Sequence, residues 1–320
     1  MEIGYNIAKA AAIIREGGLV AFPTETVYGL GGNGLDVKSI AKIFAAKQRP
    51  SFDPLILHIS SLDQLPRVLQ QPIDPRFYQL AEVFWPGPLT IVAQKSDNVP
   101  YLATSNLETV AVRMPEHPVA LQLIREANTP IAAPSANLFG RLSPTTAQHV
   151  AQQLTTIDYI IDGGNTRFGV ESTIVQLLPN NQIEILRPGA ITLLMVQTAM
   201  PQCVVSIKKH HELPNAPGML DSHYAPQKPL HLFNRVPTNS NHAIALLLPN
   251  ASKPVISSGR VIYLSKNGDE IEMASNLFAA LHTLEDDPTV EAIHAQILPE
   301  EGIAIAIMDR LRKASFKYKK

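Results

Sequence analysis

The chain has 320 residues, of which 45% are hydrophobic and 17% charged, and its 27 lysines and arginines nearly balance 28 acidic residues. This length predicts two domains, and the low charged share excludes a disordered or highly charged chain. The near-neutral charge supplies no global positive field for a nucleic acid, so any RNA contact has to be local. The single cysteine, the lack of a basic and then apolar signal segment, and the lack of an apolar run of about 18 residues predict a cytoplasmic protein without a membrane span.

Helical and strand-like patterns mix along residues 1–205, which form the first predicted domain. Apolar residues recur at helical spacing over residues 7–14 after Asn6, a capping residue, and a Gly-Gly pair then precedes a strand at residues 19–22. Ser143 followed by Pro144 predicts a helix N-cap and a first helical position. Further helices are predicted at residues 41–47 and 118–127, and further strands at residues 55–59, 110–114, 131–133, 159–161, 173–177 and 183–186.

The apolar periodicity stops near residue 207, and prolines crowd the segment that follows. This composition predicts a linker over residues 206–228. Beyond it, strands are predicted at residues 230–233, 243–248, 261–264 and 292–295, and helices at residues 270–284 and 300–313. These elements predict a small α/β domain over residues 229–320.

A formal Gly-x-Gly-x-x-Gly pattern spans residues 29–34, between a predicted strand and a predicted helix. The dinucleotide-binding form of this pattern has its first glycine in the tight turn directly after the strand. Here Thr24 to Tyr28 intervene, and Asp53 precedes the next strand instead of ending it. The pattern therefore argues against a nicotinamide site. The sequence also has no Gly-x-x-x-x-Gly-Lys-Ser/Thr loop of the kind that P-loop ATPases use.

Polar residues follow the first strand in the segment PTETVYG (residues 23–29), at the strand end where open α/β sheets usually bind ligands. An ordinary turn is the alternative, because threonine and glycine are common in turns. Lys47 and Arg49 end a predicted helix, where they either neutralise phosphate oxygens or simply favour the helix C-terminus. His58, on the next strand, fits a ligand contact or a satisfied core residue.

The order and spacing of many short motifs resemble the Sua5/YrdC/YciO family, in its longer two-domain Sua5 form. The matching segments are GLVAFPTETVYGL at 18–30, KQRP at 47–50, PL at 54–55, WPGPLT at 85–90, VRMP at 112–115, APSAN at 133–137, STIV at 172–175, RPGA at 187–190, PGM at 217–219 and HYAP at 223–226. Residues 229–320 match the Sua5 form by position and size. One departure is Gln48, which stands between the two cations where many relatives have glycine.

The resemblance implies a YrdC-like twisted open α/β sheet with a concave, positively charged cavity that binds ATP and threonine together. The linker and a small Rossmann-like α/β domain follow. The resemblance assigns threonine binding to Thr26, His58, Arg113, Ser172 and Thr173. It assigns ATP binding to Lys47, Arg49, Asp53, Thr109, Ser135, Asn137, Ser143, Arg187 and Tyr224. Lys47, Arg49 and Arg187 suit the catalytic charge role, and the Mg²⁺ that accompanies ATP is expected to have no protein ligands.

The implied activity is that of an L-threonylcarbamoyladenylate synthase, a nucleotidyltransferase that joins L-threonine, bicarbonate or CO₂, and ATP and releases pyrophosphate. Its product serves threonylcarbamoyladenosine formation in tRNA. The linker is expected to act as a lid that excludes water, with Tyr224 touching ATP; alternatively, Tyr224 docks the second domain. The downstream tRNA threonylcarbamoyl transferase is a candidate partner, and direct tRNA binding stays open. The rival hypothesis is a non-catalytic RNA-binding module, which the neutral charge and the 6% aromatic content disfavour.

Overall fold

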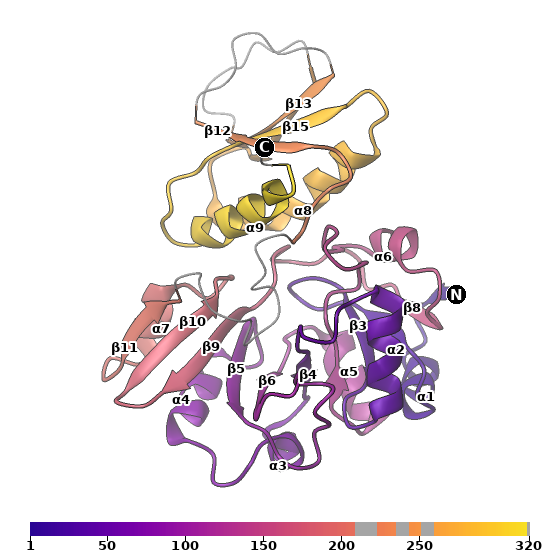
Figure 1. The fold of residues 1–320 in the computed structure, drawn as a ribbon, viewed down its shortest axis with the longest axis vertical. Coiled ribbons are helices and arrows are strands. Elements are labelled where there is room, and N and C mark those ends of the chain that lie inside the picture. The colour runs from indigo at the N-terminus through magenta and orange to yellow at the C-terminus, as the bar shows by residue number, and fades with distance from the viewer. Residues whose placement is uncertain (209–222, 235–242, 251–258, 319–320) are drawn as a thin grey trace.

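The computed structural model describes residues 1–208, 223–234, 243–250 and 259–318. Within these ranges the chain forms two α/β domains, which lie one above the other in Figure 1. The lower domain is a large twisted sheet with helices around it, and the upper domain is a smaller sheet with two helices. The predicted fold class, an open α/β sheet followed by a small α/β domain, is confirmed.

The large sheet has eleven strands in the order β1-β8-β2-β3-β7-β4-β6-β5-β9-β10-β11. The strands are β1 (Glu2–Gly4), β2 (Val20–Phe22), β3 (Gly29–Asn33), β4 (Ile56–His58), β5 (Leu89–Gln94), β6 (Thr109–Arg113), β7 (Ile131–Ala132), β8 (Tyr159–Ile161), β9 (Thr173–Leu178), β10 (Gln182–Arg187) and β11 (Val204–Ile207). The helices are α1 (Ile7–Arg15), α2 (Val37–Lys47), α3 (Leu65–Val68), α4 (Pro75–Phe84), α5 (Pro118–Ala127), α6 (Ala147–Gln153) and α7 (Leu193–Ala199). Because β11 pairs with β10, the sheet continues past residue 205, where the sequence predicted the domain to end.

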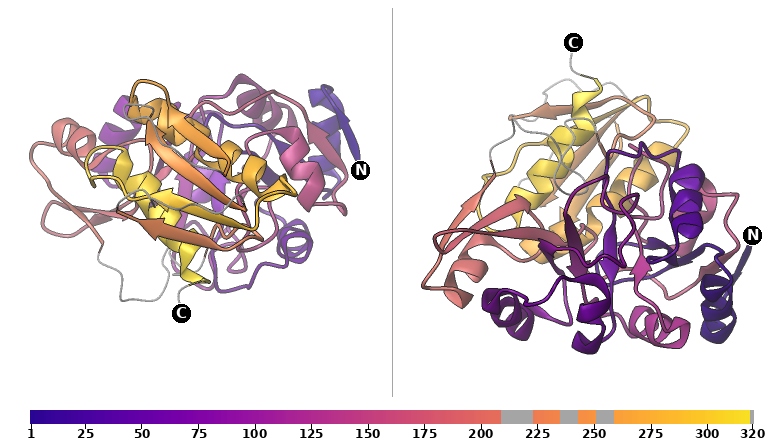
Figure 2. Two further views of the ribbon diagram at one scale, coloured as in Figure 1. Left: turned by 90° about the horizontal axis from the view of Figure 1, so that it is seen from above. Right: turned by 60° about the horizontal axis from the view of Figure 1, so that its bottom comes forward.

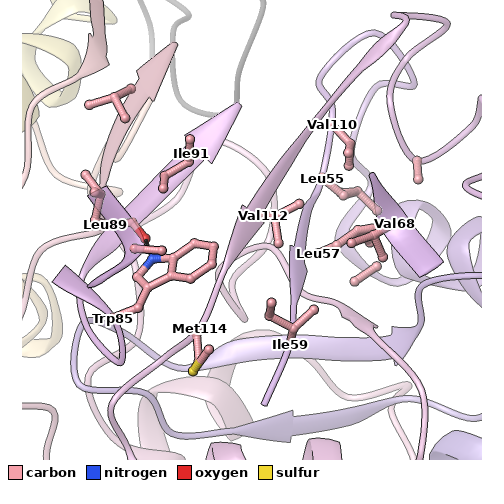
Figure 3. Packing of buried hydrophobic residues seen from close by; sticks show 14 of the residues in the cluster. Leu55, Leu57, Ile59, Val68, Trp85, Leu89, Ile91, Val110, Val112 and Met114 are labelled. Carbon is pink, nitrogen blue, oxygen red and sulfur yellow. Dashed lines mark hydrogen bonds between the residues drawn. The ribbon is translucent and has the colours of Figure 1, made fainter. Parts of the chain in front are cut away.

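The central strands direct alternate side chains to opposite faces, as a pleated strand must. One face carries the main apolar core, and Figure 3 shows Leu57 of β4, Val112 of β6 and Ile91 of β5 packed together with Trp85. Trp85 is buried there, and its Nε1 donates to the Leu89 carbonyl at 2.6 Å, which fixes the ring in a packed corner. The residues between these core positions lie on the other face of the sheet.

Local capping explains where the helices begin, and it corrects one prediction. Helix α6 begins at Ala147, and its N-cap is Thr146, whose side chain accepts from the His149 amide. Ser143 is therefore not the N-cap that the sequence predicted. The reason is that the carbonyl of Pro144 accepts the amide of Tyr28 at 2.9 Å, which holds this segment outside any helix.

Helix α2 begins four residues earlier than predicted because Asp36 provides its N-cap, and the Asp36 side chain accepts from the Lys38 and Ser39 amides. At its other end Gln48 adopts a left-handed conformation with φ of 52°. This conformation favours glycine, so the Gln48 side chain adds backbone strain to the turn between Lys47 and Arg49. The turn forms nonetheless, and the amide of Arg49 bonds to the Phe44 carbonyl.

The Gly-x-Gly-x-x-Gly pattern lies on and just after strand β3 and is not a turn between strand and helix. A Cβ on Gly31 would come within 2.9 Å of both Phe22 and Ile131, and one on Gly34 would meet Leu57 at 2.8 Å. These glycines allow close packing of β3 against its neighbours, which is a structural reason for the pattern.

The second domain has an all-parallel sheet in the order β12-β15-β13-β14. Its elements are β12 (Leu230–Phe233), β13 (Ile244–Asn250), β14 (Val261–Ser265), α8 (Glu270–Asp286), β15 (Ala292–Gln296) and α9 (Ala304–Phe316). Both helices lie between this sheet and the first domain, as Figure 1 and the left view of Figure 2 show. Helix α9 begins later than the predicted residue 300 because Gly302 has φ of 53°, which a right-handed helix excludes.

Across the parts of the chain that the structure describes, no helix combines the length and the apolar character that crossing a membrane requires. The segment 209–222, which contains most of the predicted linker, lies outside the described residues. The described end of the linker, from His223 onward, enters the contact between the two domains.

Candidate functional site

A cavity lies on the face of the large sheet opposite the main core. Its enclosed volume is about 40 Å³, and the space that it shares with open solvent at its mouth brings the total to about 510 Å³. Its walls come from the segment after β2, from strands β4, β6 and β10, from the segments after β7 and before β9, and from the end of the linker. The lining residues are Thr24, Thr26, Val27, Gly29, Arg49, Ile56, His58, Arg113, Ala133, Pro134, Ser135, Glu171, Ser172, Arg187, His223 and Tyr224.

Arg113 lies at one end of the cavity, at the last position of β6, and is 3% exposed. Its Nε donates to the Gly87 carbonyl at 3.2 Å, its Nη1 to the Thr26 hydroxyl at 3.0 Å, and its Nη2 to Glu25 Oε1 at 2.6 Å. The guanidinium is thus fixed in one orientation beside a threonine hydroxyl. A fixed guanidinium at a cavity wall is suited to bind a carboxylate with two parallel hydrogen bonds.

His58 is the neighbour of Arg113 on the paired strand β4. Burial and then the positive charge of Arg113 lower the pKa of His58 to about 3, so the imidazole is neutral at physiological pH. Its buried Nδ1 has no hydrogen-bond partner within the described part of the chain. A neutral imidazole with an unused nitrogen at the cavity wall can donate to or accept from a bound molecule.

Ser172 connects this end of the cavity to Arg187. The Ser172 hydroxyl shares a hydrogen bond of 2.8 Å with the Thr90 hydroxyl, and Arg187 Nη2 donates to the same Ser172 oxygen at 3.1 Å. Arg187 also donates from Nε to the Ser172 carbonyl at 3.1 Å. These bonds hold Arg187, at the end of β10, against the segment that precedes β9.

Lys47 and Arg49 supply positive charge at the other end of the cavity. The Lys47 ammonium is 1% exposed and donates to the carbonyls of Ser135 and Asn137, each at 2.5 Å. Burial, and then the nearby charge of Arg49, lower the pKa of Lys47 well below its usual range. Arg49 lines the cavity and pairs with Asp53 at 2.9 Å, with both side chains buried. Arg49 is a buried cation at the cavity wall, and such a charge attracts anionic oxygens strongly because little water screens it.

The structure brings eight of the predicted site residues to the cavity wall and places six others outside it. The eight are Thr26, His58, Arg113, Ser172, Arg49, Ser135, Arg187 and Tyr224. Lys47 and Asn137 lie just behind the wall: the Asn137 amide donates to the Leu138 and Arg141 carbonyls. Asp53 lies behind Arg49, and Ser143 donates to Glu171 Oε1.

Two predicted residues are directed elsewhere. The Thr173 hydroxyl donates to the Ile191 carbonyl at 2.7 Å and accepts from the Ile191 amide, so it fastens the chain after β10. Thr109 is the first residue of β6 whereas Arg113 is the last, and Thr109 lines a separate surface depression with Gln94 and Asp74. The geometry gives neither side chain direct access to the cavity.

The end of the linker forms one side of the cavity and also joins the second domain. Tyr224 is 1% exposed and has φ of 61°, and its ring lies 5.5 Å from that of Phe278 on α8. The His223 amide donates to the Lys313 carbonyl on α9. Burial lowers the pKa of His223 well below its usual range, with Arg49 adding to the effect. Tyr224 therefore docks the second domain and also lines the cavity, and its contact with ATP stays a prediction.

The sequence did not reveal two buried carboxylates, Glu25 and Glu171. Glu171 lines the cavity and accepts from Arg310 Nε of α9 at 2.8 Å. Burial alone would raise the pKa of Glu171, but the charges of Arg310 and Arg187 outweigh it and lower the pKa. Glu25 lies between Thr24 and Thr26 in the PTETVYG motif, and a charged residue between two hydroxyl residues was the one sequence feature that pointed to a role for it. Arg310 lies 139 residues from its partner Glu171, and no local sequence pattern predicts this pair.

Two family profiles match the chain, one over each part. The Sua5/YciO/YrdC profile, whose description is "Telomere recombination", matches residues 12–189, and the profile of the threonylcarbamoyl-AMP synthase C-terminal domain matches residues 190–315. The chain belongs to the Sua5/YciO/YrdC family. The boundary between the profiles at residue 190 precedes α7 and β11, which the structure assigns to the first domain.

Relatives with similarity over almost the whole chain are named threonylcarbamoyl-AMP synthase. The protein of Pyrococcus abyssi is 45% identical over 97% of this chain and 94% of its own length. The protein of Bacillus subtilis is 41% identical over 97% of this chain and 93% of its own length.

Two solved structures also resemble this chain in fold. The structure of Pyrococcus abyssi Sua5 complexed with L-threonine has a TM-score of 0.88 and 39% identity, and the match covers 99% of this chain and 98% of that one. Escherichia coli YciO has a TM-score of 0.51 and 23% identity over 59% of this chain and 94% of its own, and it supports the fold of the first domain alone.

Proposed function

We propose that the protein is a threonylcarbamoyl-AMP synthase, a nucleotidyltransferase that uses L-threonine, bicarbonate or CO₂, and ATP. The single observation that carries this proposal is a cavity that brings a fixed guanidinium, Arg113, together with buried cations at Arg49 and Arg187. Arg113 is suited to bind the carboxylate of an amino acid, and Arg49 and Arg187 are suited to bind phosphate oxygens. The full-length similarity to proteins of that name supports the same activity.

The reaction needs no protein nucleophile. The threonine amine first adds to the carbon of CO₂ and loses a proton to give a carbamate; from bicarbonate the same carbamate forms with loss of a water molecule. A carbamate oxygen then forms a bond to the α-phosphorus of ATP, and the bond from that phosphorus to the bridging oxygen breaks, so pyrophosphate leaves with its electron pair. The cavity contributes by holding both reactants in line and by balancing negative charge, and orientation alone is worth about 7 to 11 kcal/mol.

Individual residues have separate parts in this proposal. Arg113 and Thr26 hold the threonine carboxylate and orient the amine toward the nucleotide. Lys47, Arg49 and Arg187 balance the charge that accumulates on the phosphates and on the leaving pyrophosphate. Tyr224 closes one side of the cavity and limits water, which would hydrolyse the carbamate and the mixed anhydride.

Magnesium would accompany ATP as part of the substrate. The described residues include no group of three His, Cys, Asp or Glu side chains that could hold a metal. An ion that binds mainly through phosphates and keeps several waters needs no such group, and Mg²⁺, when bound, would supply further charge neutralisation at the phosphates. Product formation should therefore depend on Mg²⁺, and chelation should abolish it.

The decisive assay supplies threonine, bicarbonate and ATP·Mg²⁺ without any RNA. We expect threonylcarbamoyl-adenylate by mass spectrometry and an equal amount of pyrophosphate. An ATP analogue with a methylene bridge between the α- and β-phosphates should bind and give neither product, since the α-phosphorus is the electrophile. Product with this analogue would contradict the adenylation mechanism. RNA binding without any product would instead favour the non-catalytic alternative.

A further inference from the structure

Glu25 is a buried carboxylate that the proposed reaction does not use. It lies directly behind Arg113, with the two side chains each 4% exposed and Nη2 2.6 Å from Glu25 Oε1. Glu25 is absent from the cavity wall, whereas its neighbours Thr24 and Thr26 line it. Its carboxylate therefore reaches a bound molecule only through Arg113.

The backbone around Glu25 fixes its carboxylate in place. Glu25 Oε2 accepts the amide of Glu116 at 3.1 Å, and the Glu25 carbonyl accepts the amide of Phe168 at 2.8 Å. The Thr24 hydroxyl accepts from the amides of Thr26 and Val27, which braces the loop on its other side. Glu25 is thus a rigid anchor, whereas the long side chain of Arg113 has several rotatable bonds.

The hydrogen bonds of Arg113 show what this anchor achieves. Of its five N–H donors, Nε bonds to Gly87, one on Nη1 bonds to Thr26, and one on Nη2 bonds to Glu25. One N–H on each terminal nitrogen remains without a partner among the described residues. Two such donors are what a bidentate contact with a carboxylate requires.

We propose that Glu25 is a positioning residue of the amino-acid site: it holds the Arg113 guanidinium so that one N–H from each terminal nitrogen faces the cavity. This inference rests on the proposed binding of threonine and adds a residue that sets its affinity. A role in stability alone is the competing explanation, because a broken buried ion pair destabilises a fold wherever it lies. The two explanations differ in what happens to threonine affinity in the folded protein.

Calorimetric titration of L-threonine into the full-length protein separates them. Glu25→Gln cannot accept from both Arg113 and the Glu116 amide, because one of its two terminal atoms is a donor. Glu25→Asp keeps the charge but shortens the side chain. We expect each to weaken threonine binding about tenfold or more, the effect of losing a charge-assisted hydrogen bond, and to change the Kd of ATP less than about twofold.

Glu116→Gln is the matched control. Its side chain pairs with the exposed Arg167, so the same chemical change beside the same loop should leave the threonine Kd within about twofold of the wild-type value. In an Arg113→Lys background, Glu25→Gln should have little additional effect, because Glu25 acts only through the guanidinium. Unchanged threonine affinity in a folded Glu25→Gln protein, or fully additive effects in the double variant, would overturn the inference.

A crystal structure of Glu25→Gln tests the positioning independently of any substrate. We expect the hydrogen bond from Arg113 Nη1 to the Thr26 hydroxyl to be lost, and its retention would contradict the inference. If the wild-type protein bound no threonine, the proposed function would fail, and this structural measurement would still decide the role of Glu25.

Discussion

Arg310 of the second domain donates from Nε to Glu171 Oε2 at 2.8 Å, and Glu171 forms part of the cavity wall in the first domain. The Arg310 guanidinium is 1% exposed, also bonds to the Pro188 carbonyl, and lies 5.4 Å from the centre of the Tyr224 ring. One side chain of α9 therefore contacts both a wall residue and the end of the linker. The second domain is part of the structure that shapes the cavity.

Replacing Arg310 by methionine should destabilise the protein by about 3 to 5 kcal/mol, because Glu171 would stay buried without its charged partner. Chemical denaturation followed by circular dichroism measures this loss. Arg312→Met is the control, since Arg312 pairs with Glu300 on the surface and should change stability by no more than about 1 kcal/mol. Equal losses in the two variants would show that the Arg310–Glu171 pair contributes no more than a surface pair.

Arg113→Lys should raise the KM for threonine about tenfold or more and the KM for ATP less than about twofold. An ammonium cannot reproduce the parallel hydrogen bonds of a guanidinium, whereas the phosphate-facing cations are unchanged. Initial rates of pyrophosphate release at varied concentrations of each substrate measure both constants. Similar increases for the two substrates would count against a carboxylate-binding role.

Tyr224→Ala should lower the amount of threonylcarbamoyl-adenylate formed per pyrophosphate released, as well as the rate. The phenol ring closes one side of the cavity, so its removal admits water that hydrolyses the reactive product. Tyr224→Phe is the control, because it keeps the ring contacts with Phe278 and Arg310. Full coupling in Tyr224→Ala would mean that this ring does not exclude water.

The free energy of unfolding should fall as the pH drops below about 6.5, partly because of His282. Burial, followed by the neighbouring His149, lowers the pKa of His282 to about 3, and the two rings stack with centroids 3.9 Å apart. The unfolded chain takes up a proton near pH 6.5 and the folded chain does not. This contribution is therefore complete above pH 6.5 and is lost as the pH falls toward 3.

His282→Gln should reduce the slope of the free energy of unfolding against pH by about 1.4 kcal/mol per pH unit between pH 6 and pH 4. Glutamine keeps a donor for the Ser143 carbonyl, which His282 Nε2 contacts at 3.1 Å. Denaturant titrations at several pH values give this slope. An unchanged slope would show that His282 is protonated in the folded protein over this range.

The sequence predicted elements well where periodicity or glycine and proline boundaries were strong. Helix α5 and strands β8 and β12 have the predicted bounds, and the other predicted elements differ by a few residues at their ends. The wrong N-cap at Ser143 arose because a short-range pattern competed with the hydrogen bond of the next residue, Pro144, to Tyr28, which lies 116 positions before Pro144. Contacts of such separation leave no local signal.

The site was predictable only in part, again because some of its contacts join residues that are far apart in the sequence. Motifs at strand ends identified most of the side chains that line the cavity, because strand ends of an open sheet converge. They could not show which neighbours bind the ligand and which support the wall. Thr173 follows the lining residue Ser172 and Thr109 lies on the same strand as Arg113, but the Thr173 hydroxyl bonds to Ile191 and Thr109 lines another depression. The observed strands, with side chains that alternate between the two faces of the sheet, are needed to tell lining residues from supporting ones.

The apolar contact between the domains contains residues that also line the cavity. Val27 and Tyr224 belong to both, and they pack in one cluster with Phe278 of α8 and Leu311 of α9. The cavity wall and the second domain should therefore behave as one cooperative unit. Amide hydrogen exchange along α9 should slow when a ligand fills the cavity, although no residue of α9 lines it.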